Sequence, residues 1–357
     1  MAPKLTPAER VKSNRRQCKE ETPFKQEEGD ATDEGPAASC TDWLMAYKCF
    51  LRIIAGKTSG LSKYQPTMAL PLISGVISIA QKHDTVQKVH DVFRRLWLDY
   101  IHQQKLWDAI AQAPNQWMTL AIALKDSTIY HEAFKHLVGR SANIADGKVN
   151  PNLPEKVKSA ISRKSHSLYD ARMRAEKKLL MLTLPAIEPN AKNNKQINVG
   201  GPYVSQHKCP VEYCTVNILR DFMAEHIGQL DQEEGTLKTL ETCDHKNGCK
   251  TVAGFYRLLH AGGNAYLRDD DVIDDWNSDF EIAFEEDGEF ELRVKGALAA
   301  LKKQASREVA HLVTSTLQLG QKELEGLDYL TCVKVGAEDV PWDVEINDGD
   351  DEDMDLE

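Results

Sequence analysis

Apolar residues recur at helical spacing along most of the chain, and the clearest pattern covers residues 107–139. Side chains three, four and seven residues apart lie on one face of an α-helix. In the middle of this stretch that spacing joins Trp117, Leu120, Ala121 and Leu124. Similar groups lie before it, at residues 106–111, and after it, at residues 130–138. Because burying a tryptophan or leucine side chain stabilises a fold by about 1.5–3 kcal/mol, we expect a core here.

Residues that start or stop helices divide this stretch into three short helices. Pro114 marks the boundary between the first two, because proline restricts the residue before it. Ser127 is predicted to cap the third helix, and Gly139 is predicted to end it. No strand-like alternation interrupts the pattern, so the sequence predicts a helical array with short connections.

A further helix is predicted near Cys40, where we expect order to begin. Thr41 or Asp42 is a suitable N-cap, and Gly56 is expected to end the helix. The apolar stripe that should face the core consists of Trp43 or Leu44, Tyr47, Phe50 or Leu51, and Ile54.

Two more helices are predicted between this one and residue 107. Residues 70–83 form the first, with Pro71 in its first turn, where proline is tolerated. Residues 85–104 form the second. The expected core positions of the two helices are Ile73, Ile77, Ala80, Val86, Val89, Phe93, Leu96, Trp97, Tyr100 and Ile101.

Downstream, residues 153–183 predict a long helix with one narrow apolar face and many Lys and Arg residues. Its basic residues could meet a nucleic-acid backbone, but no aromatic residues are interleaved with them, so a solvated face is favoured. Three later helices are expected, at residues 210–230, 251–260 and 292–317. A weak β-hairpin that turns near residues 286–288 is an open alternative for residues 280–294.

These patterns predict a mainly α protein with a second, mostly helical region. Six segments are expected: a disordered arm (1–39), a helical region (40–140), a loop with the long helix (141–183), a linker (184–206), the second helical region (207–342) and a disordered acidic tail (343–357).

Composition places the protein inside the cell, in the cytoplasm or the nucleus. No apolar run reaches 18 residues, and the N-terminus lacks the apolar segment of a secretory signal. The eight cysteines are therefore expected to be reduced thiols. The net charge of −11 argues against nonspecific nucleic-acid binding by the whole chain. A nuclear-targeting or anion-binding patch could be formed by Arg10, Lys12, Arg15, Arg16 and Lys19. Because this basic run is short and broken, a solvated tail is favoured.

Five blocks of the sequence are similar to blocks of a known family: FLRIIAGK (50–57), KYQPT (63–67), IAQKHDTVQKVHDVF (79–93), LWDAIAQAPNQWMTLAIAL (106–124) and IYHEAFKHLVG (129–139). Through them, residues 41–139 resemble the C-terminal half of the BTB/POZ domain and the first helices after it, as found in fungal BTB-domain proteins. YRLLHAGGNAYL (256–267) is similar to a short motif late in the same proteins. The resemblance implies a helical protein-interaction scaffold without catalysis.

The chain departs from that family at its N-terminus. A BTB domain starts with a β-hairpin and a helix that build its homodimer face, and residues 1–39 contain nothing similar. The resemblance therefore leaves homo-oligomerisation through the usual face, and any cullin-type docking on it, without support.

The sharpest candidate for a metal site combines thiols and imidazoles, which are the ligands that zinc prefers. Its members are His207, Cys209, Cys214, Cys243, His245 and Cys249. The Cys-x4-Cys and Cys-x5-Cys spacings are wider than the usual zinc knuckle, so buried or scattered thiols are the favoured interpretation and we predict no stoichiometric zinc.

Other candidates have simpler explanations. Cys249 with His260 could form a nucleophile pair, but nothing activates the thiol, and Gly262-Gly263 is a helix stop rather than a phosphate loop. A solvated acidic loop, not a calcium loop, is predicted for Asp269, Asp270, Asp271, Asp274 and Asp275. Two histidines, His131 and His136, are expected to flank the core, and three tryptophans are expected inside it: Trp97, Trp107 and Trp117.

The leading expectation is a non-enzymatic scaffold that binds unidentified protein partners through residues 41–139, with no catalytic, cofactor or metal site and no membrane contact. Apolar anchors, rather than charge, should supply its affinity. The alternative is a nucleic-acid-associated regulator that uses the basic N-terminal arm and the helix at 153–183.

Overall fold

The computed structural model describes residues 40–102, 105–143, 149–184, 187–189, 196–198, 209–230, 251–273 and 289–342. The chain divides into two compact units, residues 1–41 and 42–357, and the fold below is that of the second unit. Helices dominate the described residues, which confirms a mainly α protein. The predicted arm at 1–39 and tail at 343–357 lie outside the described residues.

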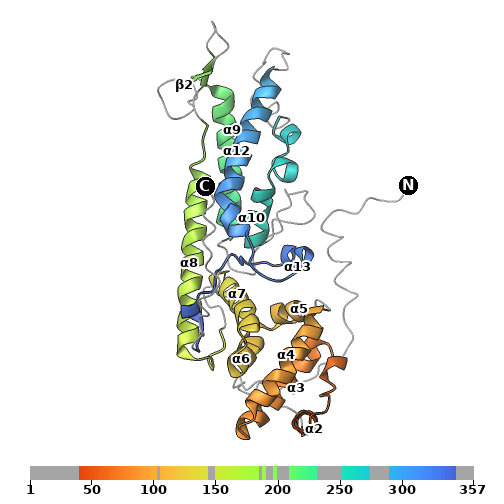
Figure 1. The fold of residues 1–357 in the computed structure, drawn as a ribbon. Coiled ribbons are helices and arrows are strands. Elements are labelled where there is room, and N and C mark those ends of the chain that lie inside the picture. Colours follow the sequence, from red (N-terminus) through yellow and green to blue (C-terminus); the bar gives the residue numbers. More distant parts are fainter. Residues whose placement is uncertain are drawn as a thin grey trace, which may run out of the picture. The chain divides into compact units, whose positions relative to one another are not determined.

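A first helical array precedes the long basic helix. It consists of α2 (Cys40–Ile54), the short η1 (Leu61–Lys63), α3 (Pro66–Lys82), α4 (Val86–His102), α5 (Lys105–Gln112), α6 (Pro114–Leu124) and α7 (Ser127–Asn143). Helix α3 packs against α4, α5 and α6, and α6 packs along α7 (Figure 1). The three short helices predicted within residues 106–139 are therefore confirmed.

Aromatic residues form the centre of this array. Trp97, Trp107 and Trp117 are all buried, as expected. The rings of Trp97 and Trp117 meet edge to face, with centroids 5.5 Å apart, a geometry that aromatic pairs prefer. The Tyr100 hydroxyl donates a 3.0 Å hydrogen bond to the carbonyl of Leu61, which ties α4 to η1.

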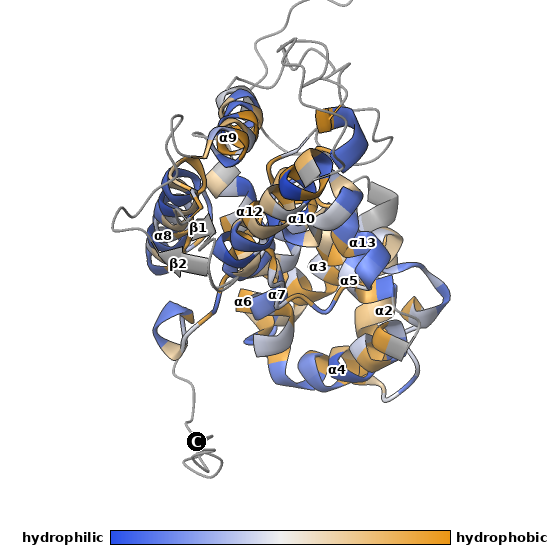
Figure 2. Cartoon of the chain, turned by 90° about the horizontal axis from the view of Figure 1, so that it is seen from above, coloured by the Kyte–Doolittle hydropathy of each residue, from blue (hydrophilic) through white to orange (hydrophobic). Residues whose placement is uncertain are grey.

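A second array contains the long helix. It consists of α8 (Glu155–Leu180), α9 (Pro210–Leu230), α10 (Val252–Ala261), the short η2 (Gly263–Ala265) and α12 (Glu289–Val313). Helices α8, α9 and α12 lie side by side, and α10 packs on α12 (Figure 1). In Figure 2 the ribbon of α8 is mostly hydrophilic, whereas that of α3 is mostly hydrophobic. This difference agrees with a long helix that buries only a narrow face.

Within the predicted linker, β1 (Ile187–Pro189) and β2 (Gln196–Asn198) pair antiparallel, with Ile187 opposite Asn198. The rest of residues 185–208 lies outside the described residues.

The chain returns after α12 to the first array. Residues 314–342, which we call the return segment, include α13 (Gln321–Glu325) and η3 (Ala337–Asp339). Lys135 of α7 donates to the carbonyl of Thr316 at 2.5 Å, and Glu132 accepts from the backbone N–H of Gln318 at 2.8 Å. These contacts fix the return segment along α7.

Gly139 does not end a helix, contrary to the prediction, because α7 continues to Asn143. A Cβ at this position would collide with the carbonyl oxygen of Leu330 and would lie 2.6 Å from Cδ2 of Tyr329. The glycine therefore provides room for the return segment to cross α7.

Two predicted helix starts were also wrong. Asp126, not Ser127, caps α7, since its carboxylate accepts the backbone N–H of Ile129 at 3.0 Å. Helix α3 begins at Pro66, so Pro71 lies in its second turn instead of its first. Proline at the first helical position is favoured because its φ suits the helix and its missing N–H is not needed there.

The hairpin considered for residues 280–294 was wrong in its second half, which is helical from Glu289 in α12. Phe290, Val294 and Leu298 recur every four residues, and they pack together at the start of this helix. Helical spacing therefore extends upstream of the predicted start at residue 292.

The buried face of α2 also differs from the prediction. Helix α2 begins at Cys40, so Thr41 and Asp42 lie inside it rather than at its cap. Its buried residues are Ala46, Cys49, Phe50 and Ile53. Ala46 faces Gly75 of α3, where an added Cβ would come within 2.8 Å of the Ala46 Cβ. This close packing of small residues turns the larger apolar stripe of α2 outward.

Candidate functional site

The most prominent exposed apolar group in the first array lies on α2. Five large side chains, which we call the α2 stripe, recur at helical spacing along its outer face: Trp43, Leu44, Tyr47, Leu51 and Ile54. Leu44 is 72% exposed and Leu51 is 61% exposed. Single exposed apolar residues are ordinary, but a continuous row of them is typical of an interaction surface.

The opposite face of α2 holds the helix in place. The ring of Phe50 stacks on that of His83, at the end of α3, with centroids 5.7 Å apart. The rings of Trp43 and Tyr47 lie 6.2 Å apart on the outer face. The stripe is therefore presented by a helix whose other face is packed into the core.

Cations border the α2 stripe on both edges. Lys48 is one turn from both Leu44 and Leu51, and Arg52 follows it by a further turn. On the other edge, Nζ of Lys82 lies 5.3 Å from the centroid of the Trp43 ring. The stripe is thus an apolar row between positive charges.

The charge of the surrounding helices has the same sign. Residues 42–102 contain eight Lys and Arg residues against four Asp and no Glu, whereas the whole chain carries a net charge of −11. The part of the protein around α2 is therefore basic within an otherwise acidic chain.

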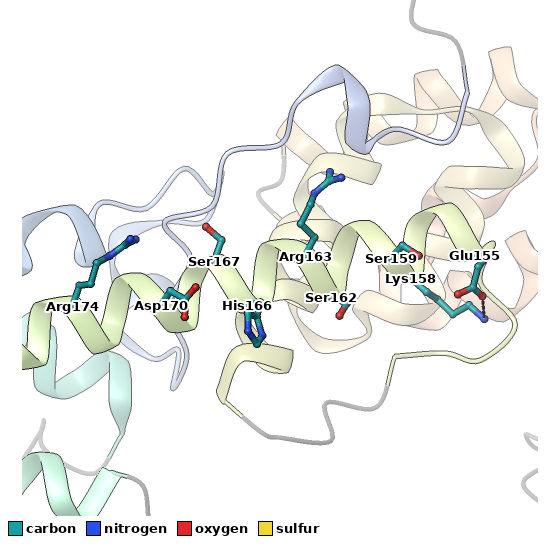
Figure 3. A pocket seen from close by; sticks show the side chains of 9 residues that line it. All are labelled: Glu155, Lys158, Ser159, Ser162, Arg163, His166, Ser167, Asp170 and Arg174. Atoms are coloured by element: carbon teal, nitrogen blue, oxygen red, sulfur yellow. Dashed lines mark ion pairs between the residues drawn. The ribbon is translucent and has the colours of Figure 1, made fainter.

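A shallow, open groove runs along the outer face of α8 (Figure 3). Its lining comes from α8 alone: Glu155, Lys158, Ser159, Ser162, Arg163, His166, Ser167, Asp170 and Arg174. Because one helix supplies every wall, the groove does not enclose a small ligand in the way that typical binding sites do.

Several cations of α8 are engaged within the fold. Lys158 pairs with Glu155 at 2.8 Å, and Lys178 pairs with Glu308 at 2.7 Å. Arg163 and Lys164 both pair with the buried carboxylate of Asp339 in η3. Burial raises the pKa of Asp339, but hydrogen bonds from the Gly336 backbone, Lys164 and Arg163 bring the pKa below its usual value. Arg163 and Lys164 thus fasten the return segment to α8, and Lys178 fastens α12 to it.

Comparisons with family models, curated proteins and solved structures yield no match. Among the helices described, none is both long enough and apolar enough to cross a bilayer.

A buried histidine lies between α7 and the return segment. His136 is fully buried, so the prediction that it flanks the core was wrong. Its Nδ1 lies 2.7 Å from the hydroxyl oxygen of Tyr329, and the guanidinium of Arg140 lies 5.5 Å from the centroid of the Tyr329 ring. Burial, with Arg140 and Lys135 nearby, lowers the pKa of His136 to about 3. The imidazole is therefore uncharged at neutral pH.

A buried ion pair joins α8 to α10. Nε of Arg172 donates to Oε1 of Glu176 at 2.7 Å, and the hydroxyl of Tyr256 donates to the same oxygen. All three residues are buried. Burial and the neighbouring Glu176 carboxylate raise the pKa of Tyr256, so the phenol keeps its proton. The triad therefore joins the two helices through a carboxylate and a phenol that are both withdrawn from solvent.

The predicted metal ligands are described only in part. Cys209 is buried immediately before α9 and Cys214 is half-buried within it. Four predicted ligands lie outside the described residues: His207, Cys243, His245 and Cys249. Cys249 is also the thiol of the predicted Cys249–His260 pair, so that pair is described only at its histidine. In the portions of the chain that are described, no three His, Cys, Asp or Glu side chains gather as a metal site would require. That the protein binds no stoichiometric zinc therefore stays a prediction.

The acidic loop contains ion pairs where it is described. Asp269 lies 3.5 Å from Nζ of the buried Lys302, which also donates to the carbonyls of Gly263 and Leu267 at 2.7 Å. Asp270 pairs with Lys295, and Asp271 pairs with Arg268. Gly262 and Gly263 follow α10 with φ of 60° and 54°, which confirms a helix stop. Asp274 and Asp275 lie outside the described residues.

Sequence reasoning identified every residue of the α2 stripe but assigned the stripe to the core. The signal for the correct orientation was the second, smaller apolar row on the same helix, at Ala46, Cys49, Phe50 and Ile53. The contacts that bury this row come from distant residues, including Gly75, which lies 29 residues after Ala46 in the sequence, and His83.

Proposed function

We propose that this chain is a non-enzymatic protein-interaction scaffold of the BTB/POZ-like type, and that a partner docks on the α2 stripe. The observation that carries the proposal is the exposed row of five large apolar side chains on a helix whose opposite face is buried. The resemblance of residues 41–139 to the later part of BTB/POZ domains supports the same conclusion.

The chemistry of the stripe suits binding. Tryptophan and tyrosine are enriched among the residues that dominate interface energies, and Trp43 and Tyr47 lie one turn apart on α2. Removing apolar surface from water contributes about 25 cal/mol per Å². A partner that covers the stripe therefore removes from water Leu44 and Leu51, its two most exposed members.

The dimensions of the stripe favour a small partner element. Helix α2 has 15 residues, which corresponds to a length of about 22 Å. One helix face of that length covers less than the about 800 Å² per partner of a standard protein interface. A single helix laid across α2 is the mode of recognition that fits this area.

The basic helix α8 supports the nucleic-acid alternative less well. Ion pairs with Glu155, Glu308 and Asp339 engage four of its cations: Lys158, Lys178, Arg163 and Lys164.

The test identifies the proteins that bind to the wild-type full chain and to each of two variants. Light scattering then measures the mass of each recovered complex. Leu44→Glu/Leu51→Glu places charge in the stripe, whereas Leu292→Glu changes a leucine on α12 that is equally exposed, at 72%. Substitutions at such exposed positions change stability by only about 0.5 kcal/mol, so all three proteins should fold.

The proposal predicts a stoichiometric complex with the wild type and Leu292→Glu, and loss of that complex with the stripe variant. If the stripe variant keeps the same partners as the wild type, or the wild type remains a monomer without partners, the proposal is wrong.

A further inference from the structure

We infer that the partner element that occupies the α2 stripe is an acidic amphipathic helix. This inference rests on the proposed function and adds the chemistry of the ligand. It follows from the shape of the stripe and from the charges at its two edges.

The shape of the stripe indicates a helical ligand. The stripe is one helix face wide and follows α2 from Trp43 to Ile54. Trp43 and Tyr47 are 37% and 39% exposed, and Leu44 and Leu51 are 72% and 61% exposed. A helix that places apolar residues at i, i+3, i+4 and i+7 covers such a row when it lies across it.

The charges at the edges of the stripe indicate that the docked helix is acidic. Lys48 and Arg52 border one edge and Lys82 borders the other. All three are exposed in the absence of a partner. The polar residues beside the apolar row of a docked helix would face these cations, so carboxylates at those positions are favoured and ammonium groups are repelled. The excess of Lys and Arg over Asp in residues 42–102 extends the same preference beyond the edges.

The same charges argue against a second copy of this chain as the occupant. When two α2 helices face each other across a two-fold axis, each edge of one stripe meets an edge of the other. Because both edges are cationic, every such arrangement places like charges together, which costs affinity.

The experiment measures binding of labelled peptides to the full chain by fluorescence anisotropy. Three peptides of about 16 residues share one row of leucines at i, i+3, i+4 and i+7 and carry Glu, Gln or Lys at the polar positions. The inference predicts that the Glu peptide binds about tenfold more tightly than the Gln peptide, and that the Lys peptide binds most weakly. Raising the salt concentration from about 50 to about 300 mM should reduce the preference for the Glu peptide, because salt screens exposed charges.

Three double variants locate the effect. Lys48→Glu/Lys82→Glu should abolish the preference for the Glu peptide, whereas Lys156→Glu/Lys177→Glu on α8 makes the same change in net charge and should keep it. Leu44→Ser/Leu51→Ser removes apolar surface without adding charge and should weaken binding of all three peptides. Far-ultraviolet circular dichroism confirms that each variant retains its helices.

The outcomes separate this inference from the proposed function. If the peptides bind in a stripe-dependent way but with no charge preference, or the Lys peptide binds best, the ligand chemistry is wrong and the docking surface stands. If Leu44→Ser/Leu51→Ser binds every peptide as well as the wild type, the docking surface itself is wrong. If the Glu peptide does not bind at about 100 µM, the inference is overturned. Stripe-dependent binding to vesicles with about 30% phosphatidylserine, without peptide binding, also overturns it in favour of a membrane.

Discussion

Nδ1 of His136 and the hydroxyl oxygen of Tyr329 lie 2.7 Å apart, although the two residues are 193 positions apart in the sequence. This contact joins α7 of the first array to the return segment that follows α12. Together with the contacts of Glu132 and Lys135, it makes the C-terminal part of the chain a structural component of the first array.

The buried state of His136 predicts loss of stability in mild acid. In the unfolded chain a histidine takes up a proton near pH 6.5, whereas burial lowers the pKa of His136 to about 3 in the folded protein. Its contribution is therefore fully present above pH 6.5 and is lost as the pH falls from 6.5 towards 3, by up to about 1.4 kcal/mol per pH unit.

Urea unfolding at pH 7.5 and pH 5 measures this effect. The change in unfolding free energy between the two pH values should be smaller in His136→Gln than in the wild type, because glutamine does not titrate. Equal changes in the two proteins would show that His136 is protonated in the fold, contrary to our account.

Removing the hydroxyl of Tyr329 should destabilise the protein. Tyr329→Phe keeps the ring but leaves Nδ1 of the buried His136 without this partner, and an unsatisfied buried polar group costs about 1–3 kcal/mol. Urea unfolding at pH 7.5 measures the loss. A midpoint equal to that of the wild type would mean that the contact contributes nothing to the fold.

Gly139→Ala should destabilise the protein even though alanine is the better helix former. The new Cβ would collide with the Leu330 carbonyl oxygen and approach the Tyr329 ring. Gly296→Ala in α12 is the matched control, because no atom lies within 4 Å of its added Cβ. The control should gain up to about 1 kcal/mol from helix propensity. Thermal denaturation should therefore shift the two variants in opposite directions, and a rise in melting temperature for both would contradict the close crossing at Gly139.

The buried triad between α8 and α10 should be sensitive to loss of its cation. Arg172→Met leaves the carboxylate of Glu176 buried and unpaired with that guanidinium, and breaking a buried pair costs about 3–5 kcal/mol. Lys178→Met removes the cation from the more exposed pair with Glu308, which contributes about 0–1 kcal/mol. Urea unfolding of both variants tests the difference, and equal losses would show that burial of the triad has no energetic consequence.

Local signals predicted much of the fold. Helix α9 covers residues 210–230 as expected, and Thr251 begins α10 as an N-cap that accepts the N–H of Gly254 at 3.0 Å. The apolar spacing of α4 and α6 also placed their tryptophans in the core. These features depend on residues that are close in the sequence, so a local pattern is sufficient to reveal them.

The remaining features depend on contacts between distant residues. In the sequence Gly139 resembles a helix stop, whereas in the fold it lies where the return segment crosses α7. His136 contacts Tyr329 of the same segment. For α2, two apolar rows compete, and the close approach of Ala46 to Gly75 decides between them. The exposed row is the candidate interaction surface. The sequence pattern identified its residues but placed them in the core.

Site-specific photo-crosslinking tests the central claim, docking on the α2 stripe, most directly. A benzophenone side chain is introduced at Leu51 in one full-length protein and at Leu292 in another, and each is irradiated in an extract of its native cells. Our account predicts an adduct at Leu51 that maps by mass spectrometry to one segment of one partner, and no such adduct at Leu292. Adducts at Leu292 alone, or the same adducts at both positions, would contradict it.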